Sequence, residues 1–203
     1  MPFFLILCWG IAGYLSGSLV WGYWISKYFY GIDIRTKGSG NIGATNVFRV
    51  LGPVPGIFTF ILDVFKGALP IILLKMAYGT NTEEYLLIST GIATILGSKF
   101  SIFLRGKGGK AVNCSFGVIL GILPKEAIIS FFIWLFIFLS TGYVSLASMT
   151  AATALPFLTY FLQKNLIFTV ATTVISTVII VAHKENIKRL VSGKENRFML
   201  WKK

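Results

Sequence analysis

Long apolar segments separated by short polar ones run along the whole chain. Seven segments approach the roughly 20 residues that a helix needs to cross a bilayer, and they lie at about 3–29, 54–75, 85–100, 110–123, 126–140, 143–161 and 166–182. Leu123-Pro124-Lys125-Glu126 between the fourth and fifth fits either a tight turn or a break within a re-entrant pair, and we favour two spans. The pattern predicts an all-α, polytopic integral membrane protein with seven transmembrane helices, forming a single domain over residues 1–203.

Composition supports a membrane protein. Of the 203 residues, 55% are hydrophobic and 13% are charged, which is unlike a soluble domain. The first residues, MPFFLILCWGIAGYLSG, lack a positive start, so we expect a retained span and not a cleaved signal peptide. Cys8 and Cys114 lie in apolar surroundings without a C-x-x-C pair, so we interpret both as small hydrophobic residues and expect no metal site.

The few charges are mostly positive and predict the orientation. The formal net charge is +12. With seven crossings, one side receives 15 of the 19 Lys and Arg residues, at 27, 35, 37, 49, 99, 105, 107, 110, 184, 188, 189, 194, 197, 202 and 203. The other side receives only Lys75, Lys125 and Lys164. Because cytoplasmic loops carry the excess of Lys and Arg, we expect the N-terminus outside and the C-terminus in the cytoplasm.

The polar stretch RTKGSGNIGATN, residues 35–46, contains G-x-G-x-x-G. A dinucleotide site needs that pattern in a soluble strand–turn–helix unit, whereas here membrane spans flank it. Its glycines can bring backbone N–H groups close to an anion. Neutral donors and a cation lie nearby, and the candidate ligands are Ser39, Gly40, Asn41, Asn46 and Arg49. The alternative is a solvated loop whose glycines only make turns.

A second polar stretch concentrates glycine and lysine. Residues 106–110 read GKGGK, but no Ser or Thr follows and the spacing does not match a phosphate-binding Walker motif. At the start of a helix such a run offers N–H groups, a helix dipole and two ammonium groups, so phosphate is its expected ligand. The candidate residues are Lys107, Gly108, Gly109 and Lys110.

The third stretch, HKENIKRLVSGKE at 183–195, follows the last span and holds the only histidine of the chain. If the helix continues, His183, Asn186 and Arg189 share one face, and the apolar residues between them face the membrane surface. We weight His183 toward a functional role because it lies beside other anion-binding stretches at the cytoplasmic boundary.

Two features inside the spans leave alternatives open. Asp63 and Lys66 are three residues apart within an apolar segment, and each is the other's expected partner. Structural pairing and support of a site are equally good explanations. The hydroxyls of Ser145 and Ser148 begin a span, where they either contact substrate or pack between helices.

These stretches in this order, GSGNIGATN with Arg49, GKGGK and HKENIKRLVSGKE, together with LDVFKG and YVSLAS, resemble the bacterial acyl-phosphate:glycerol-3-phosphate acyltransferases. The resemblance covers most of the chain. It implies transfer of an acyl group from acyl phosphate to the 1-hydroxyl of sn-glycerol 3-phosphate, which yields lysophosphatidic acid and phosphate in phospholipid biosynthesis. It also implies a bacterial inner membrane, with the site on the cytoplasmic face.

The same resemblance assigns site residues. It implies catalytic roles for Ser39, His183 and Lys107. It implies substrate binding by Gly40, Asn41, Asn46, Arg49, Gly108, Gly109, Lys110, Ser145, Asn186 and Glu195. Acyl phosphate is already activated, so positioning, oxyanion stabilisation and uptake of one proton suffice. Either His183 or the departing phosphate accepts that proton.

Three positions depart from the family pattern. Ser98 stands where a histidine is usual, Ser101 where a proline is usual and Ala111 where a glycine is usual.

Other enzyme classes fit less well. Position 188, five residues after His183, is Lys, so the His-x-x-x-x-Asp dyad of other glycerolipid acyltransferases is absent. Asp33 and Asp63 cannot form the aspartate run of a CDP-alcohol phosphatidyltransferase. We therefore expect no metal and no cofactor.

Two rivals from other classes remain. A transporter of phosphorylated anions could use the same loops, although its polar groups should lie near mid-bilayer. A structural membrane protein would explain the lysines alone. The expected partners are acyl phosphate, glycerol 3-phosphate and membrane lipids, without nucleic acid and without an obligatory protein partner.

Overall fold

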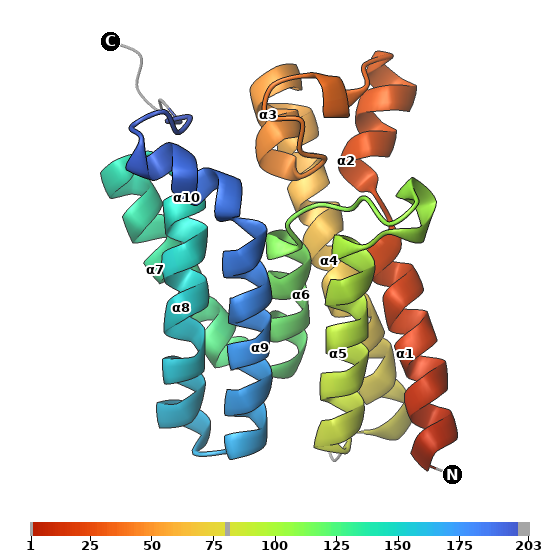
Figure 1. Cartoon of the computed structure of the whole chain (residues 1–203). Helices are drawn as coiled ribbons and strands as arrows, with labels where there is room; N and C mark the ends of the chain where they lie inside the picture. The colour runs from red at the N-terminus through yellow and green to blue at the C-terminus, as the bar shows by residue number, and fades with distance from the viewer. Residues whose placement is uncertain (1, 80–81, 199–203) are drawn as a thin grey trace. The chain divides into compact units, whose positions relative to one another are not determined.

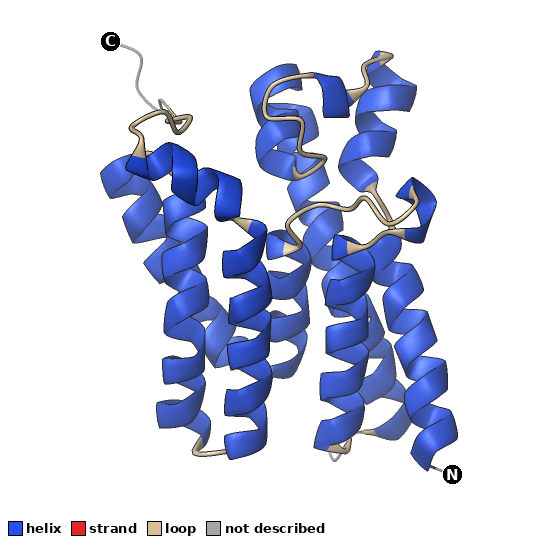
Figure 2. Ribbon diagram, in the orientation of Figure 1, coloured by secondary structure: helices blue, strands red, loops and turns tan. Residues whose placement is uncertain are grey.

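The computed structural model describes residues 2–79 and 82–198, and it contains helices and loops but no strand within those residues (Figures 1 and 2). Three residues used in the sequence predictions lie outside the described ranges: Met1 at the start of the N-terminal stretch, and Lys202 and Lys203 among the cations that set the orientation. By its contacts the chain separates into two compact units, Met1–Ile122 and Leu123–Lys203. The single domain expected from the sequence stays a prediction.

The first unit begins with a broken helix. Its elements in chain order are α1 (Pro2–Ser18), α2 (Trp21–Trp24), the π turn η1 (Ile25–Phe29), the 3₁₀ turn η2 (Ile34–Thr36), α3 (Ala44–Leu51), α4 (Pro53–Tyr78), α5 (Glu84–Lys99), the 3₁₀ turn η3 (Ile102–Leu104) and α6 (Val112–Ile122). α1 packs on α5 and α4 packs on α6 (Figure 1). Glycines permit this packing, because a side chain at Gly17 would overlap the backbone of Thr94 and one at Gly67 would overlap that of Cys114.

Over its described residues, 123–198, the second unit contains four helices. They are α7 (Pro124–Thr141), α8 (Val144–Gln163), α9 (Leu166–Ala182) and α10 (Lys184–Val191). α8 packs against both α7 and α9. α9 and α10 meet at an angle of 58° at His183, so the condition considered for the third stretch, a helix that continues straight, is not met.

Each predicted apolar segment is helical, although the segment 3–29 is interrupted between Ser18 and Trp21. Among the described residues, fewer than seven helices have the length and composition needed to cross a membrane. Among the described residues, five helices meet both requirements: Phe3–Phe29, Pro53–Tyr78, Glu84–Leu104, Pro124–Thr141 and Val144–Gln163. A sixth span results if Leu166–Ala182 and Lys184–Val191 count as one, and Val112–Ile122 is shorter. The all-helical membrane class is confirmed, while the count of seven spans and the sidedness stay predictions.

Candidate active site

In the first unit, one buried asparagine organises the loop of residues 30–43, called here the first loop. Asn46 is 1% exposed, and its Nδ2 lies 3.2, 3.0 and 2.9 Å from the carbonyl oxygens of Ile34, Lys37 and Asn41. Its Oδ1 accepts the N–H of Ser39 at 2.8 Å. Both ends of this side chain are thus used to hold the loop, which makes Asn46 a structural centre and leaves Ser39 exposed above it.

The glycine-rich backbone of the first loop faces inward. The N–H of Gly40 donates to the carbonyl of Lys37 at 3.0 Å, and that of Gly43 donates to Asn41 Oδ1 at 2.8 Å. Gly38 and Gly40 have φ angles of 58° and 71°, a region that suits glycine. The sequence predicted that these amides would meet an anion. In the structure the N–H groups of Gly40 and Gly43 are engaged inside the loop, and binding of an anion by this loop stays a prediction.

One cation of the first loop is already paired. Arg35 donates from Nε and Nη2 to the two carboxylate oxygens of Asp33, at 2.9 and 2.6 Å, and its guanidinium lies 4.6 Å from the centre of the Tyr23 ring. The hydrogen bond from Arg35 is the main cause that lowers the pKa of Asp33 to about 2. Arg49, on α3, is exposed and adds a second guanidinium to this part of the unit.

The loop of residues 100–111, called here the second loop, folds back on the end of α5. The N–H groups of Gly108 and Gly109 donate to the carbonyls of Lys99 and Ser98, both at 3.1 Å. A Cβ at Gly108 would overlap the carbonyl oxygen of Ser98, so glycine is needed there for the close approach. α6 begins only at Val112, so GKGGK precedes the helix and does not open it.

The side chain of Lys107 is exposed, whereas its N–H donates to the Leu104 carbonyl at 3.0 Å. Ala111 has a φ of 61°, in the left-handed region, and is 6% exposed. Glycine adopts this conformation without the steric penalty that alanine carries, which fits the glycine that the family resemblance implies at position 111.

The two loops of the first unit lie against one another. A Cβ placed on Gly109 would lie 3.6 Å from Ile42 Cγ1 and 3.7 Å from Asn41 Oδ1. The rings of Trp24 and Phe103, before the first loop and within the second, have centroids 5.5 Å apart. Two stretches more than sixty residues apart in sequence are thus in contact, and each carries an exposed polar side chain, Ser39 on the first loop and Lys107 on the second.

In the second unit, His183 lies at the bend between α9 and α10 and is 2% exposed. Its Nδ1 is 2.8 Å from the carbonyl oxygen of Ile179. Since a carbonyl oxygen only accepts hydrogen bonds, Nδ1 carries the proton in this contact. In the neutral ring Nε2 then holds the lone pair, which is the arrangement that a general base requires.

Glu195 joins three elements of the second unit. Its Oε1 accepts hydrogen bonds from Ser145 Oγ at 2.9 Å and from Asn186 Nδ2 at 2.7 Å, while its Oε2 forms an ion pair with Arg189 Nε at 2.7 Å. Burial opposes ionisation of this carboxyl, but the three hydrogen bonds together outweigh it and lower its pKa. A carboxylate engaged in this way positions its neighbours and is a poor partner for phosphate.

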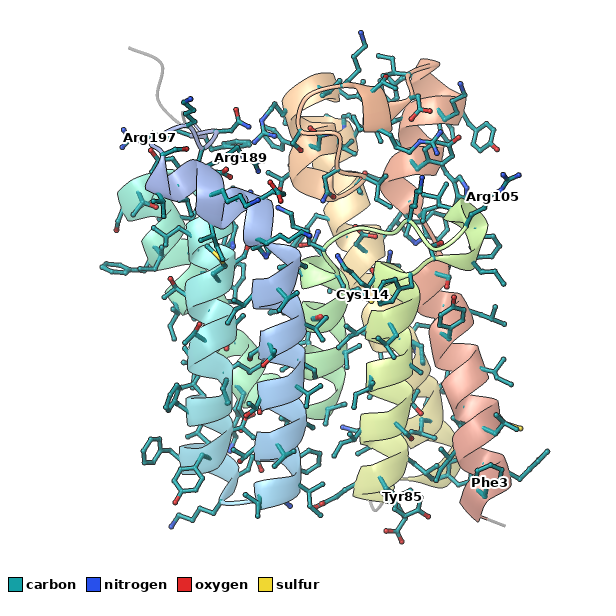
Figure 3. The ribbon with its side chains drawn as sticks, in the orientation of Figure 1. Phe3, Tyr85, Arg105, Cys114, Arg189 and Arg197 are labelled. Carbon is teal, nitrogen blue, oxygen red and sulfur yellow. The ribbon has the colours of Figure 1, made fainter. Side chains whose placement is uncertain are left out.

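The tail beyond Glu195 is also fastened. Arg197 Nε donates to the carbonyl of Thr141 at 3.0 Å, and the N–H of Phe198 donates to that of Gly142 at 2.8 Å. Figure 3 labels Arg189 on α10 and Arg197 on the tail that follows it. α10 and the start of α8 are therefore held at one end of the unit, where His183 and Asn186 also lie.

Comparison with known proteins identifies the family. The family model described as glycerol-3-phosphate acyltransferase matches residues 7–193. The chain is 43% identical over 188 residues to a glycerol-3-phosphate acyltransferase of Geotalea daltonii, covering 93% of this chain and 95% of the relative. The chain belongs to the glycerol-3-phosphate acyltransferase family. The enzyme of that name from Aquifex aeolicus is likewise 43% identical over 191 residues, covering 93% and 96% of the two chains.

Solved structures agree with this membership. The crystal structure of PlsY (YgiH), an integral membrane glycerol 3-phosphate acyltransferase, in its glycerol 3-phosphate form matches with a TM-score of 0.89 and 40% identity. Its lysophosphatidic acid form matches with a TM-score of 0.86 and 39% identity. In each case 95% of both chains is covered. The family resemblance drawn from the sequence is confirmed.

In this member of the glycerol-3-phosphate acyltransferase family, the residues predicted to form the site belong to both units. The first unit holds Ser39, Gly40, Asn41, Asn46, Arg49, Lys107, Gly108, Gly109 and Lys110, and the second holds Ser145, His183, Asn186 and Glu195. Their roles toward substrate stay predictions.

Sequence reasoning missed that Ser101 Oγ donates to the carbonyl of Ser18 at 2.6 Å and that Arg189 forms an ion pair with Glu195. The only sequence signals were a hydroxyl where a proline is usual and an arginine six residues before a glutamate.

Proposed function

We propose that this protein transfers an acyl group from acyl phosphate to the 1-hydroxyl of sn-glycerol 3-phosphate, giving lysophosphatidic acid and inorganic phosphate. The observation that supports this most directly is the 40% identity, over 95% of both chains, to a glycerol 3-phosphate acyltransferase crystallised in its glycerol 3-phosphate form. The bond from the acyl carbon to the phosphate oxygen breaks, a bond to the glycerol oxygen forms, and the hydroxyl proton goes to a base. The product is an intermediate of phospholipid biosynthesis.

In the first unit the cationic and hydroxyl side chains bind phosphate. Lys107, exposed on the second loop, and Arg49, exposed on α3, supply charge, and Lys110 adds a third cation. Ser39 is exposed on the first loop and donates a hydrogen bond from its hydroxyl to a substrate oxygen. Because the amides of Gly40, Gly108 and Gly109 are engaged inside the loops, the glycines act by shaping the loops.

In the second unit His183 and Asn186 contribute the polar groups that act on substrate. His183 Nε2 is a base for the 1-hydroxyl, and the departing phosphate is the alternative proton acceptor. Asn186 and Ser145 are held by Glu195, which acts by positioning them. No covalent acyl-enzyme is needed, because an acyl phosphate is an anhydride with a good leaving group.

We further propose seven spans, with the N-terminus outside and the C-terminus in the cytoplasm of a bacterium, and catalysis at the cytoplasmic face of the inner membrane. The support is the distribution of 15 cations against three in the predicted loops. The reaction as written needs neither metal nor redox cofactor, and no obligatory protein partner takes part.

The test measures phosphate release from acyl phosphate by the purified protein in detergent. We expect release that depends on glycerol 3-phosphate and matches the lysophosphatidic acid formed. Lys107→Ala and His183→Ala should each lower kcat/KM at least about a hundredfold. Lys125→Ala is the matched control, since Lys125 is an exposed lysine that is not among the candidate site residues of either unit.

Two results would overturn the proposal. One is release of phosphate without glycerol 3-phosphate at the same rate, and the other is counterflow of labelled glycerol 3-phosphate across vesicles without acylation. The second result would favour the transporter.

A further inference from the structure

The break between α1 and α2 leaves backbone carbonyls without helical partners inside an apolar segment. α1 ends at Ser18 and α2 begins at Trp21. A carbonyl without a hydrogen bond is costly where water is excluded. The carbonyl of Ser18 accepts the hydroxyl of Ser101 at 2.6 Å, and the carbonyl of Leu19 accepts Lys66 Nζ, also at 2.6 Å. Both orphan carbonyls thus take their partners from elsewhere in the unit.

The partner of Leu19 is one half of a buried ion pair. Lys66 Nζ lies 2.8 Å from Asp63 Oδ1, and the two side chains are 6% and 13% exposed. The backbone of the same lysine is also used, since its carbonyl accepts Ser16 Oγ at 2.8 Å. A buried ion pair is weak evidence for stability, because desolvation of the two charges offsets their attraction. The contact of Lys66 with the Leu19 carbonyl therefore indicates a role for the ion pair other than stability.

This break is connected to both loops of the candidate site. After the break the chain runs through α2 and η1 into the first loop, which carries Ser39. Ser101, which holds the Ser18 carbonyl, begins the second loop, and its own carbonyl accepts the N–H of Gly106 at 2.8 Å. A change in direction at Leu19 therefore displaces the first loop relative to the second.

We infer that Asp63 and Lys66 are positioning residues of the site in the first unit. The ammonium of Lys66 fixes the carbonyl of Leu19 and thereby the direction in which α2 leaves α1. The carboxylate of Asp63 forms an ion pair with that ammonium and so directs it toward the carbonyl. The inference rests on the proposed function for its kinetic consequence, whereas its structural consequence can be measured separately.

The experiment compares Lys66→Met and Asp63→Asn with the double variant carrying both changes. Each single variant should lower the melting temperature, and Lys66→Met more so because it leaves a carboxylate buried without its partner. The double variant removes both charges and should recover most of that loss. It still has no donor for the Leu19 carbonyl, so its KM for glycerol 3-phosphate should stay raised at least about tenfold. Lys66→Arg keeps a cationic donor and should restore KM in part.

Hydrogen exchange supplies a readout that needs no catalysis. In the double variant, amides of the first and second loops should exchange at least about tenfold faster, while those of α8 stay unchanged. Lys75→Met is the matched control, because Lys75 also lies on α4 and donates to a backbone carbonyl, that of Gly121 at 2.6 Å, but has no role at the break. That variant should leave exchange in both loops as in the wild type.

The outcomes separate this inference from the proposed function. A double variant with wild-type KM and wild-type exchange in both loops would show that the ion pair serves folding alone and would overturn the inference. A wild-type protein without acyl transfer would refute the proposed function, yet the exchange comparison would still decide whether Asp63 and Lys66 hold the loops.

Discussion

The carboxylate of Glu195 offers the sharpest test of how the second unit is organised. Its side chain is 6% exposed and accepts hydrogen bonds from Ser145 and Asn186, both buried, and an ion pair from Arg189, which is 37% exposed. Hydrogen bonds to an ionised acceptor contribute about 1.5 kcal/mol each. The half-exposed ion pair adds about 0.5 kcal/mol. The contacts of Glu195 therefore hold α10 with about 3.5 kcal/mol.

Two substitutions of Glu195 separate the contributions of its contacts. Glu195→Ala removes all three contacts and should speed exchange of the α10 amides by a few hundredfold, because each 1.36 kcal/mol is a factor of about ten. Glu195→Gln keeps one carbonyl oxygen for Ser145 and Asn186 but turns an NH₂ group toward Arg189. Glu195→Gln should therefore reduce the stabilisation of α10 by about 2 kcal/mol and speed exchange of its amides about thirtyfold.

The matched control is Glu185→Gln on the same helix. The side chain of Glu185 is 58% exposed, and its nearest ionic contact is Lys188 at 3.5 Å, so this change should shift exchange by less than about threefold. Mass spectrometry of peptides spanning α10 makes the comparison directly. Equal exchange in Glu195→Gln and Glu185→Gln would refute the assignment of Glu195 as the organising residue.

Four further expectations concern the loops and pH. Asn46→Asp should lower the melting temperature by several degrees, because a carboxylate would face three carbonyl oxygens. Gly108→Ala should destabilise the protein by at least about 2 kcal/mol, since its Cβ would overlap a backbone carbonyl, whereas Gly109→Ala should unfold like wild type because its Cβ meets only ordinary contacts. Ala111→Gly should raise the free energy of unfolding by about 1 kcal/mol, because glycine removes the strain of the positive φ. Unfolding in denaturant measures the effect of all three substitutions. Because the pKa of Glu195 is lowered in the folded protein, its contribution to stability is complete above the ordinary pKa of 4.5 and is lost as pH falls through the lower, folded pKa. Hydrogen exchange of the α10 amides, corrected for the intrinsic rate, should therefore rise in that acidic range and stay constant near neutral pH.

The helices were predictable from local composition. The segments expected at 54–75 and 126–140 correspond to α4 (Pro53–Tyr78) and α7 (Pro124–Thr141). The pairing of Asp63 with Lys66 was also expected, because residues three apart share a helix face. In each case the information lies within one stretch of chain, since a helix satisfies its own backbone and an apolar environment selects apolar side chains.

The organisation of the site depended on partners distant in sequence. Nothing local to GSGNIGATN indicated that Asn46 would bind three carbonyls of its own loop, or that the glycine amides would turn inward. The role of Glu195 requires Ser145, which is 50 residues away. The segment expected as one helix at 3–29 is interrupted between Ser18 and Trp21, where Lys66 and Ser101 supply donors to the carbonyls.

The sequence by itself thus determined the all-helical membrane class, the family and the residue types gathered at the helix ends. The tertiary structure alone decided which way each amide points, which carboxylate organises the second unit, and where the first helix breaks. Hydropathy and motif spacing are properties of the chain read in order. Hydrogen bonds are directional contacts of a few ångströms, and those between distant segments form only once the fold has brought the segments together.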